Sequence, residues 1–247
     1  MPTIYNTVGG LDGWIQHSTS TGAGGSWNAT HDAATGTTAD SNDSLTNESI
    51  GAWCTADKFF TNYYILRSYL VFSTSAISVA PSAATLRIYG YSSTSGDVIA
   101  IEGTWTGASS LSTGDWDSFT GYQAGWDSGD VTAYSNEVST WSTSGYNDFT
   151  LNAAALAKMA SSNTLSIVLM NHTYDYMDAT PNLGGRTGCD TEQNGMYWSA
   201  YSATSKDPYI DYTSGGYAND TLGQDMDDET YKVIGVESGD ISKVIGA

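Results

Sequence analysis

Residues 84–104 decide the fold: Ala-Thr-Leu-Arg-Ile-Tyr-Gly-Tyr, then Ser-Ser-Thr-Ser-Gly-Asp, then Val-Ile-Ala-Ile-Glu-Gly-Thr. In the first part, Leu86 and Ile88 share one face of an alternating pattern, which is typical of a strand with one buried side. The opposite face carries Arg87, Tyr89 and Tyr91. The polar residues 92–97 predict a hairpin loop leading into a second strand at 98–104.

The same pattern of short apolar or alternating runs, separated by Gly, Ser, Thr, Asn and Asp, continues along the chain. It predicts an all-β protein, and 247 residues suffice for one large β-sandwich or two small domains. One short helix is expected at 153–160, capped by Asn152. Long loops between weak strands are expected at 19–47. The expected strands are 13–17, 63–72, 84–91, 98–104, 148–151, 164–171, 196–201 and 209–212.

Two stretches form a recognisable pattern: Arg-Ser-Tyr-Leu-Val-Phe-Ser-Thr-Ser at 67–75 and Ala-Ala-Thr-Leu-Arg-Ile-Tyr-Gly at 83–90. They resemble jelly-roll domains of the DNRLRE type. Later segments follow in the expected order, at 99–105, 149–152 and 207–212. The resemblance covers roughly residues 60–212, and it implies a jelly-roll-like antiparallel β-sandwich of the kind found in bacteriophage virion proteins and bacterial surface proteins. Because these are packing motifs, they specify fold better than activity.

The composition narrows the function classes. The chain has 8 basic and 27 acidic residues, a formal net charge of −19, which repels nucleic-acid backbones and favours cations as ligands. Its 17 tyrosines and 8 tryptophans suit broad sheet faces and wet binding surfaces, because each ring has a polar tip. Apolar runs are far shorter than the ~20 residues of a membrane-spanning helix, so no membrane insertion is expected. Residues 1–6 lack the features of a secretory signal, which predicts synthesis and assembly in a host cytoplasm.

Two cysteines, Cys54 and Cys189, lie far apart in the sequence. They form either one bridge across the sandwich or two buried thiols, and the spacing of two cysteines does not decide between these alternatives.

The last 34 residues differ from the rest. We expect residues 1–213 to form the jelly-roll sandwich and residues 214–247 to form an acidic linker and an extended arm. Lys-Val-Ile-Gly occurs twice in this segment, at 232–235 and 243–246. A lone hairpin of this kind is marginal in water, so we expect either a frayed tail or an arm that adds strands to a neighbouring subunit. The arm residues are Val233, Ile234, Val244 and Ile245.

Sequence motifs for catalysis are absent from the chain. It has no Gly-x-Ser-x-Gly elbow, no His-Glu-x-x-His and no phosphate-binding loop. The three histidines share no metal-ligand spacing. Glu102 and Glu137 are conceivable as a glycosidase carboxylate pair, but nothing in the sequence marks them. We therefore expect a protein that is not an enzyme and needs no cofactor.

Structural calcium is the stronger chemical hypothesis, because Ca²⁺ prefers clustered oxygen ligands in loops. Solvated turn carboxylates are the alternative. The expected ligands are Asp115, Asp117, Asp127 and Asp130.

Trp116 and Trp126 lie beside these carboxylates in loop-like sequence. An exposed tryptophan next to carboxylates stacks on a sugar ring while the carboxylates bind its hydroxyls, so these two are the expected glycan-binding residues.

Together these features favour a non-enzymatic bacteriophage virion protein, as capsid decoration or as part of a head or tail fibre. Its expected partners are other virion proteins, further copies of itself and host surface glycans. The first alternative is a carbohydrate-binding or adhesive module of a bacterial surface protein, located on the cell surface or outside the cell. The second alternative is a glycan hydrolase or lyase.

Overall fold

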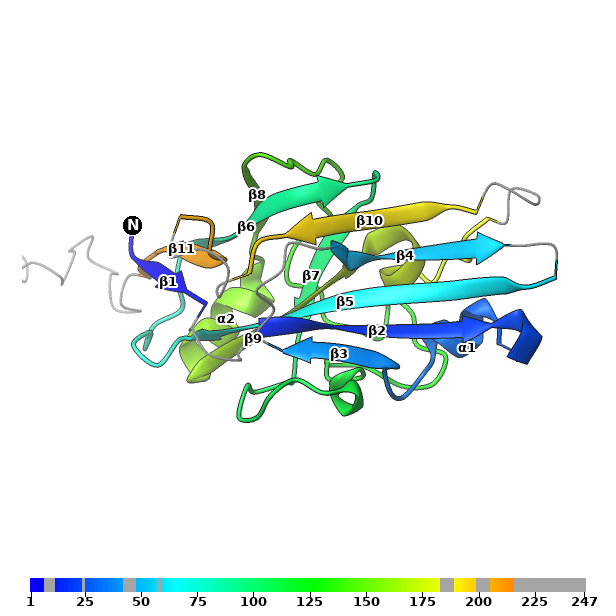
Figure 1. The fold of residues 1–247 in the computed structure, drawn as a ribbon. Helices are drawn as coiled ribbons and strands as arrows, with labels where there is room; N and C mark the ends of the chain where they lie inside the picture. The colour runs from blue at the N-terminus through cyan, green and yellow to red at the C-terminus, as the bar shows by residue number, and fades with distance from the viewer. Residues whose placement is uncertain are drawn as a thin grey trace, which may run out of the picture.

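The computed structural model describes residues 1–6, 12–23, 25–41, 48–56, 59–182, 189–198 and 205–215. These residues form an all-β sandwich in which every strand pairing is antiparallel (Figure 1). The strands are β1 (Thr3–Tyr5), β2 (Asp12–Ser20), β3 (Thr38–Ser41), β4 (Glu48–Ala56), β5 (Thr61–Ser73), β6 (Ala83–Ser93), β7 (Val98–Glu102), β8 (Tyr146–Thr150), β9 (Thr164–Asn171), β10 (Thr191–Met196) and β11 (Tyr209–Thr213).

Two sheets face each other. One has the order β3-β2-β5-β9-β7, and the other contains β8, β6, β11 and β1. Strands β4 and β10 connect β5 to β6, so the two sheets are continuous along one side. From β5 to β9 the chain changes sheet at every step, which is the connectivity expected of a jelly roll.

The main core lies between the two sheets. Leu70 and Phe72 of β5 pack there with Leu86 and Ile88 of β6, and all four side chains are fully buried. The alternation predicted for β6 is confirmed, since its residues are in turn buried and partly exposed from Ala84 to Gly90.

A second core covers the outer face of β5, β7 and β9. It is formed by long loops between β7 and β8 together with the short helix α1 (Trp27–His31). In β7, Val98 and Ala100 face the main core while Ile99 and Ile101 face the second. Burial on both faces explains why these strands are apolar at nearly every position.

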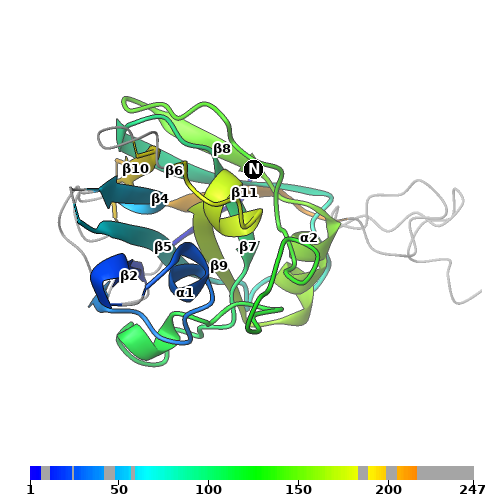
Figure 2. The same ribbon diagram turned by 90° about the vertical axis from the view of Figure 1, so that its right-hand side faces the viewer.

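The helix α2 (Ala153–Ser161) confirms the helix expected at 153–160. The Asn152 side chain accepts hydrogen bonds from the backbone N–H groups of Ala154 and Ala155, as an N-cap residue should. The expectation of a single helix is wrong, because α1 also forms, capped by Ser26. Figure 1 shows α1 near the right-hand end of the sandwich and α2 toward its left, and Figure 2 views the molecule from the end that carries α1. Three shorter helical turns are η1 (Thr21–Ala23), η2 (Thr113–Asp115) and η3, a π-helix (His172–Tyr176).

The hairpin expected at 92–97 is not formed. Strand β6 pairs with β8, β10 and β11, whereas β7 pairs with β9, so this segment carries the chain from one sheet to the other. Turn-forming residues serve both kinds of connection, and only the long-range pairing distinguishes them.

The strand expected at 196–201 is also misplaced. The observed strand β10 ends at Met196 and begins at Thr191, with the sequence Thr-Glu-Gln-Asn-Gly-Met. Backbone pairing to β4 and β6 holds this polar segment in the sheet. The sequence has no apolar alternation there, so pattern alone does not detect the strand; β1, β3 and β4 were missed as well.

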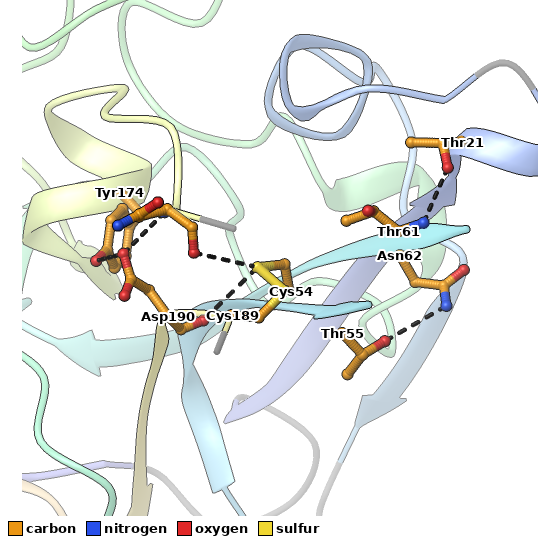
Figure 3. The surroundings of a disulfide bond; sticks show 9 residues. Thr21, Cys54, Thr55, Thr61, Asn62, Tyr174, Cys189 and Asp190 are labelled. Carbon is orange, nitrogen blue, oxygen red and sulfur yellow. Dashed lines mark hydrogen bonds between the residues drawn. A yellow bond between two sulfur atoms is a disulfide. The ribbon is translucent and has the colours of Figure 1, made fainter. Parts of the chain in front are cut away.

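Cys54 and Cys189 form a disulfide, with Cα atoms 5.3 Å apart and a sequence separation of 135 (Figure 3). Cys54 lies on β4, and Cys189 directly precedes β10, its neighbour in the sheet. The bond therefore joins adjacent strands rather than crossing the sandwich. Hydrogen bonds from Tyr174 and from the Asn182 backbone to the Asp190 carboxylate hold the segment beside it.

The expected arm residues Val233, Ile234, Val244 and Ile245 lie outside the described residues, as does nearly all of the expected segment 214–247. In the described part of the chain, no helix is long and apolar enough to cross a membrane.

Candidate functional site

Trp116 and Trp126, the expected glycan-binding residues, are both fully buried. The expectation is wrong, because a ring without exposed surface does not stack on a sugar. Although the surrounding sequence is polar and loop-like, the loop lies over the outer face of β5 and packs both indoles into the second core.

The two rings surround a buried guanidinium. Arg67 lies 3.9 Å from the Trp116 ring centroid and 5.5 Å from that of Trp126. Its Nε and Nη2 donate to the two Asp175 oxygens at 2.8 and 2.7 Å. Burial alone would lower the pKa of Arg67, but the Asp175 carboxylate outweighs it and holds the pKa above its ordinary value. The pair is therefore charged and closed to solvent, which suits a structural role.

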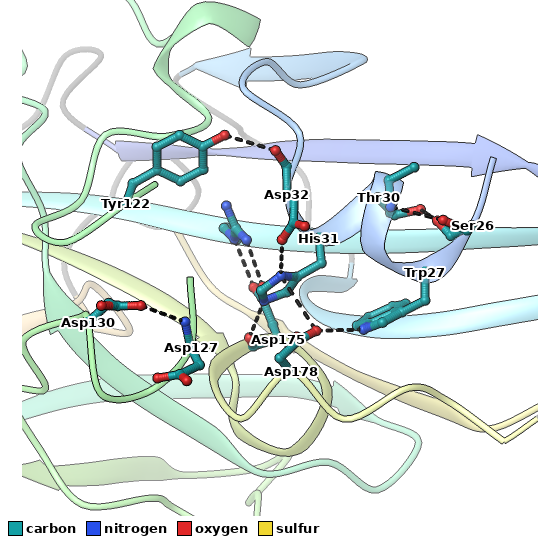
Figure 4. Close-up of polar contacts among 12 residues, drawn as sticks. Ser26, Trp27, Thr30, His31, Asp32, Tyr122, Asp127, Asp130, Asp175 and Asp178 are labelled. Atoms are coloured by element: carbon teal, nitrogen blue, oxygen red, sulfur yellow. Dashed lines mark hydrogen bonds and ion pairs between the residues drawn. The ribbon is translucent and has the colours of Figure 1, made fainter. Parts of the chain in front are cut away.

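His31 extends this cluster (Figure 4). Its ring stacks on Trp126 with centroids 4.3 Å apart. Its Nε2 lies 2.8 Å from the Asp175 carbonyl oxygen and its Nδ1 lies 2.8 Å from Asp32 Oδ1. The cluster thus ties α1 and η3 to the centre of β5, and it holds the loops over the sheet.

The four expected calcium ligands lie in tight turns. Asp115 Oδ2 accepts from the backbone N–H and the hydroxyl of Ser112. Asp127 Oδ1 accepts from Gly129 N, and Asp130 Oδ2 accepts from Asp127 N. These contacts match solvated turn carboxylates. In the described ranges, the only set of three potential ligands with donor atoms within 4.8 Å of one another is elsewhere. Calcium at Asp115, Asp117, Asp127 and Asp130 stays a prediction.

The set of three potential metal ligands that lie close together consists of Asp97, Glu137 and His172. His172 Nδ1 lies 2.7 Å from Glu137 Oε2 and 3.4 Å from Asp97 Oδ2. Thr173 donates its backbone N–H and its hydroxyl to the Asp97 carboxylate. Close contacts between the imidazole and the two partly exposed carboxylates account for this arrangement. Glu102, the other carboxylate considered, is paired with Lys158 at 2.9 Å.

A different surface gathers side chains that sequence reasoning did not bring together. Strands β1, β11, β6 and β8 bury Leu86, Phe149 and Ile210 in the main core, so the alternate residues face outward. In register, Tyr5 lies opposite Tyr209. This outward face carries six partly or fully exposed tyrosines, here called the tyrosine row: Tyr5, Tyr209, Tyr146, Tyr89, Tyr197 and Tyr91.

The rings of the tyrosine row contact one another in that order. Successive centroids lie 5.6, 5.0, 5.1, 5.5 and 5.7 Å apart. All but the first contact are edge-to-face, a geometry that aromatic pairs prefer. At the two ends, Tyr5 is 53% and Tyr91 43% exposed, so the row is open to solvent. Mutual packing holds these rings in place.

Two tyrosine hydroxyls are anchored to the backbone. Tyr89 donates to the Ser144 carbonyl at 2.7 Å, and Tyr146 donates to the Ser205 carbonyl at 3.2 Å. Burial, together with the neighbouring Tyr209, raises the pKa of Tyr146 to about 12. Its phenol is therefore neutral and a hydrogen-bond donor at physiological pH.

Two cationic side chains lie beside the tyrosine row. Arg87 lies 5.9 Å from the Tyr209 ring centroid and pairs with Asp211 at 3.3 Å and Asp148 at 3.8 Å. Lys206 lies over the row near its other end, 4.0 Å from the Tyr197 ring centroid.

A second, smaller aromatic contact lies on another sheet. Trp53 of β4 and Tyr64 of β5 are both half-buried and stack with centroids 4.9 Å apart and planes 7° apart. Neither residue was expected to have a role. Trp53 belongs to a strand that the sequence pattern did not reveal.

No protein-family model matches the chain, and a search of curated proteins finds no relative.

Proposed function

We propose that this protein is a non-enzymatic, surface-displayed binding protein that contacts saccharides through the tyrosine row. The observation that carries the proposal is the continuous series of six outward-facing tyrosines on one sheet. Tyrosine rings stack on the apolar faces of sugars while their hydroxyls bind sugar hydroxyls. Because neighbouring rings hold each other in place, little side-chain freedom is lost on binding.

The setting that we propose is a bacteriophage virion, where the protein decorates the capsid or forms part of a fibre that touches host glycans. The resemblance to DNRLRE-type jelly rolls and the acidic, hydroxyl-rich composition support it. The Cys54–Cys189 bond supports a location outside a reducing cytoplasm, since such bonds persist in oxidising surroundings. The protein should copurify with phage particles, and its absence from them would count against this setting. A bacterial surface adhesin is the alternative location for the same binding activity.

The test of saccharide binding compares variants on a glycan array and by calorimetry. Tyr209→Ala and Tyr146→Ala each remove a ring from the middle of the tyrosine row. Each should weaken binding by about 1–2 kcal/mol, or roughly tenfold, the usual loss for a central aromatic contact.

The matched control is Tyr64→Ala, which removes a half-buried tyrosine from the Trp53 stack on another strand. It should leave binding unchanged. If Tyr64→Ala abolishes binding while the row variants do not, the Trp53–Tyr64 stack is the site instead. If no saccharide binds to the wild-type protein, the proposed function is wrong.

A further inference from the structure

The described basic residues differ in their charge partners. Three of them have a carboxylate within 4.0 Å. Arg67 lies that close to Asp175, and Lys158 lies that close to Glu102. Arg87 lies that close to both Asp148 and Asp211. Lys206 is the one basic residue in the described part of the chain without a carboxylate inside that distance. In a chain with a net charge of −19, an ammonium group left without such a partner is unexpected.

Lys206 is held in the tyrosine row. Its Nζ lies 4.0 Å from the Tyr197 ring centroid and 5.0 Å from that of Tyr89. These two rings belong to adjacent segments, because Tyr197 N donates to the Tyr89 carbonyl at 3.0 Å. Aromatic faces attract a cation but do not neutralise it, so the ammonium keeps its full charge beside the stacking surface.

We infer that the ligand of the tyrosine row is an acidic saccharide, in which an anionic group pairs with Lys206 while the sugar rings stack on the tyrosines. The inference rests on the proposed function and adds the charge class of the ligand. A lysine presents a point charge rather than a bidentate fork, so it binds an anionic group without demanding one geometry.

The net negative charge of the protein opposes this binding at long range. That field is screened beyond about 8–10 Å at physiological ionic strength, whereas a contact at Lys206 acts within about 4 Å. Of the described carboxylates near this face, Asp148 and Asp211 are paired with Arg87, and Asp207, which follows Lys206 in the sequence, is buried. The local contact therefore decides which saccharide is preferred.

The experiment uses two probes that differ only in charge: an oligogalacturonate and its methyl ester. Sialyllactose and its methyl ester serve as a second pair. Wild-type protein should bind the charged member of each pair about tenfold more tightly, the equivalent of one good ion contact. Lys206→Met keeps the aliphatic stem over the rings and removes the charge, so this variant should bind both members equally. Lys206→Arg should retain the preference.

Lys158→Met is the matched control, since Lys158 is paired with Glu102 away from the tyrosine row. It should keep the wild-type preference, and melting curves establish that each variant is folded. Equal binding of both probes to wild type, or an unchanged preference in Lys206→Met, overturns the inference and leaves the proposed function standing. If neither member of either pair binds, and the glycan array is also blank, the proposed function fails and the inference falls with it.

Discussion

At the scale of single residues, burial decides which charges stabilise the protein. Arg67 and Asp175 are both fully buried, whereas the side chains of Arg87 and Asp148 are 34% and 52% exposed. A buried charge that loses its partner remains desolvated, while an exposed one is solvated by water. The two pairs should therefore respond very differently to the same substitution.

Asp175→Asn should lower the free energy of unfolding by about 3–5 kcal/mol, because it leaves the Arg67 charge buried without a counter-charge. Asp148→Asn, the exposed counterpart, should cost less than about 1 kcal/mol. Chemical denaturation of both variants measures the difference. Equal losses of stability in the two variants would contradict the conclusion that desolvation makes the Arg67–Asp175 pair the more sensitive one.

Two glutamates should have opposite effects on the pH dependence of stability. Burial, together with Asp97 and Asp190, raises the pKa of Glu192. For Glu102 burial acts in the same direction, but the hydrogen bond and charge of Lys158 outweigh it, and the pKa is lowered. A raised carboxyl pKa means that ionisation costs stability above the ordinary pKa, and this cost disappears as the pH falls. A lowered pKa means that ionisation contributes stability above the ordinary pKa, which is lost in acid.

Glu192→Gln should therefore raise the melting temperature at pH 7, and Glu102→Gln should lower it. The Glu192 difference should vanish below about pH 4, where an unperturbed glutamate is mostly protonated, whereas the Glu102 difference should persist until the pH falls below the lowered pKa of that residue. Thermal melts across this pH range provide the measurement. A decrease at pH 7 for Glu192→Gln would contradict the assigned direction.

At the scale of elements, the disulfide joins β4 to the segment just before β10, so it links two neighbouring strands that lie far apart in the sequence. Strand β10 lies between β4 and β6, although the two cysteines have a sequence separation of 135. Its polar sequence and its interrupted register, shifted near Asn194, suggest little stability of its own. The covalent bond compensates by restricting the unfolded chain.

Reduction of the disulfide should lower the free energy of unfolding by about 4–5 kcal/mol, the loop-closure estimate for a loop of this length. Denaturation with and without a reductant measures the effect. A Cys54→Ser, Cys189→Ser double variant is the control, because its stability should not respond to the reductant. A wild-type protein that is equally stable in both conditions would contradict this account.

At the scale of the whole molecule, we predict separate roles for the sandwich and the expected arm. The described structure reaches Gly215, two residues past the end of β11. If residues 214–247 act as an assembly arm, the intact chain should be a stable oligomer by light scattering. A chain that ends at residue 215 keeps all of β11 and should be a folded monomer. Two folded monomers would rule out assembly through the arm.

Much of the local structure was predictable because it depends on short periodicities. The alternation in β6 placed Tyr89 and Tyr91 on one face opposite Leu86, and Asn152 marked the start of α2. The apolar run of β9 predicted its bounds correctly, at Thr164–Asn171. Each of these signals lies within a few residues of the element that it predicts.

The tertiary structure alone decided the partners of each strand and the candidate site. Polar neighbours marked Trp116 and Trp126 as exposed, yet their loop folds over β5 and buries both around Arg67. The tyrosine row combines residues from five segments between Tyr5 and Tyr209, and only register brings their rings together. Side-chain alternation determines which face of a strand a residue occupies. Which residues share that face depends on pairings across more than a hundred residues, and no local pattern encodes those.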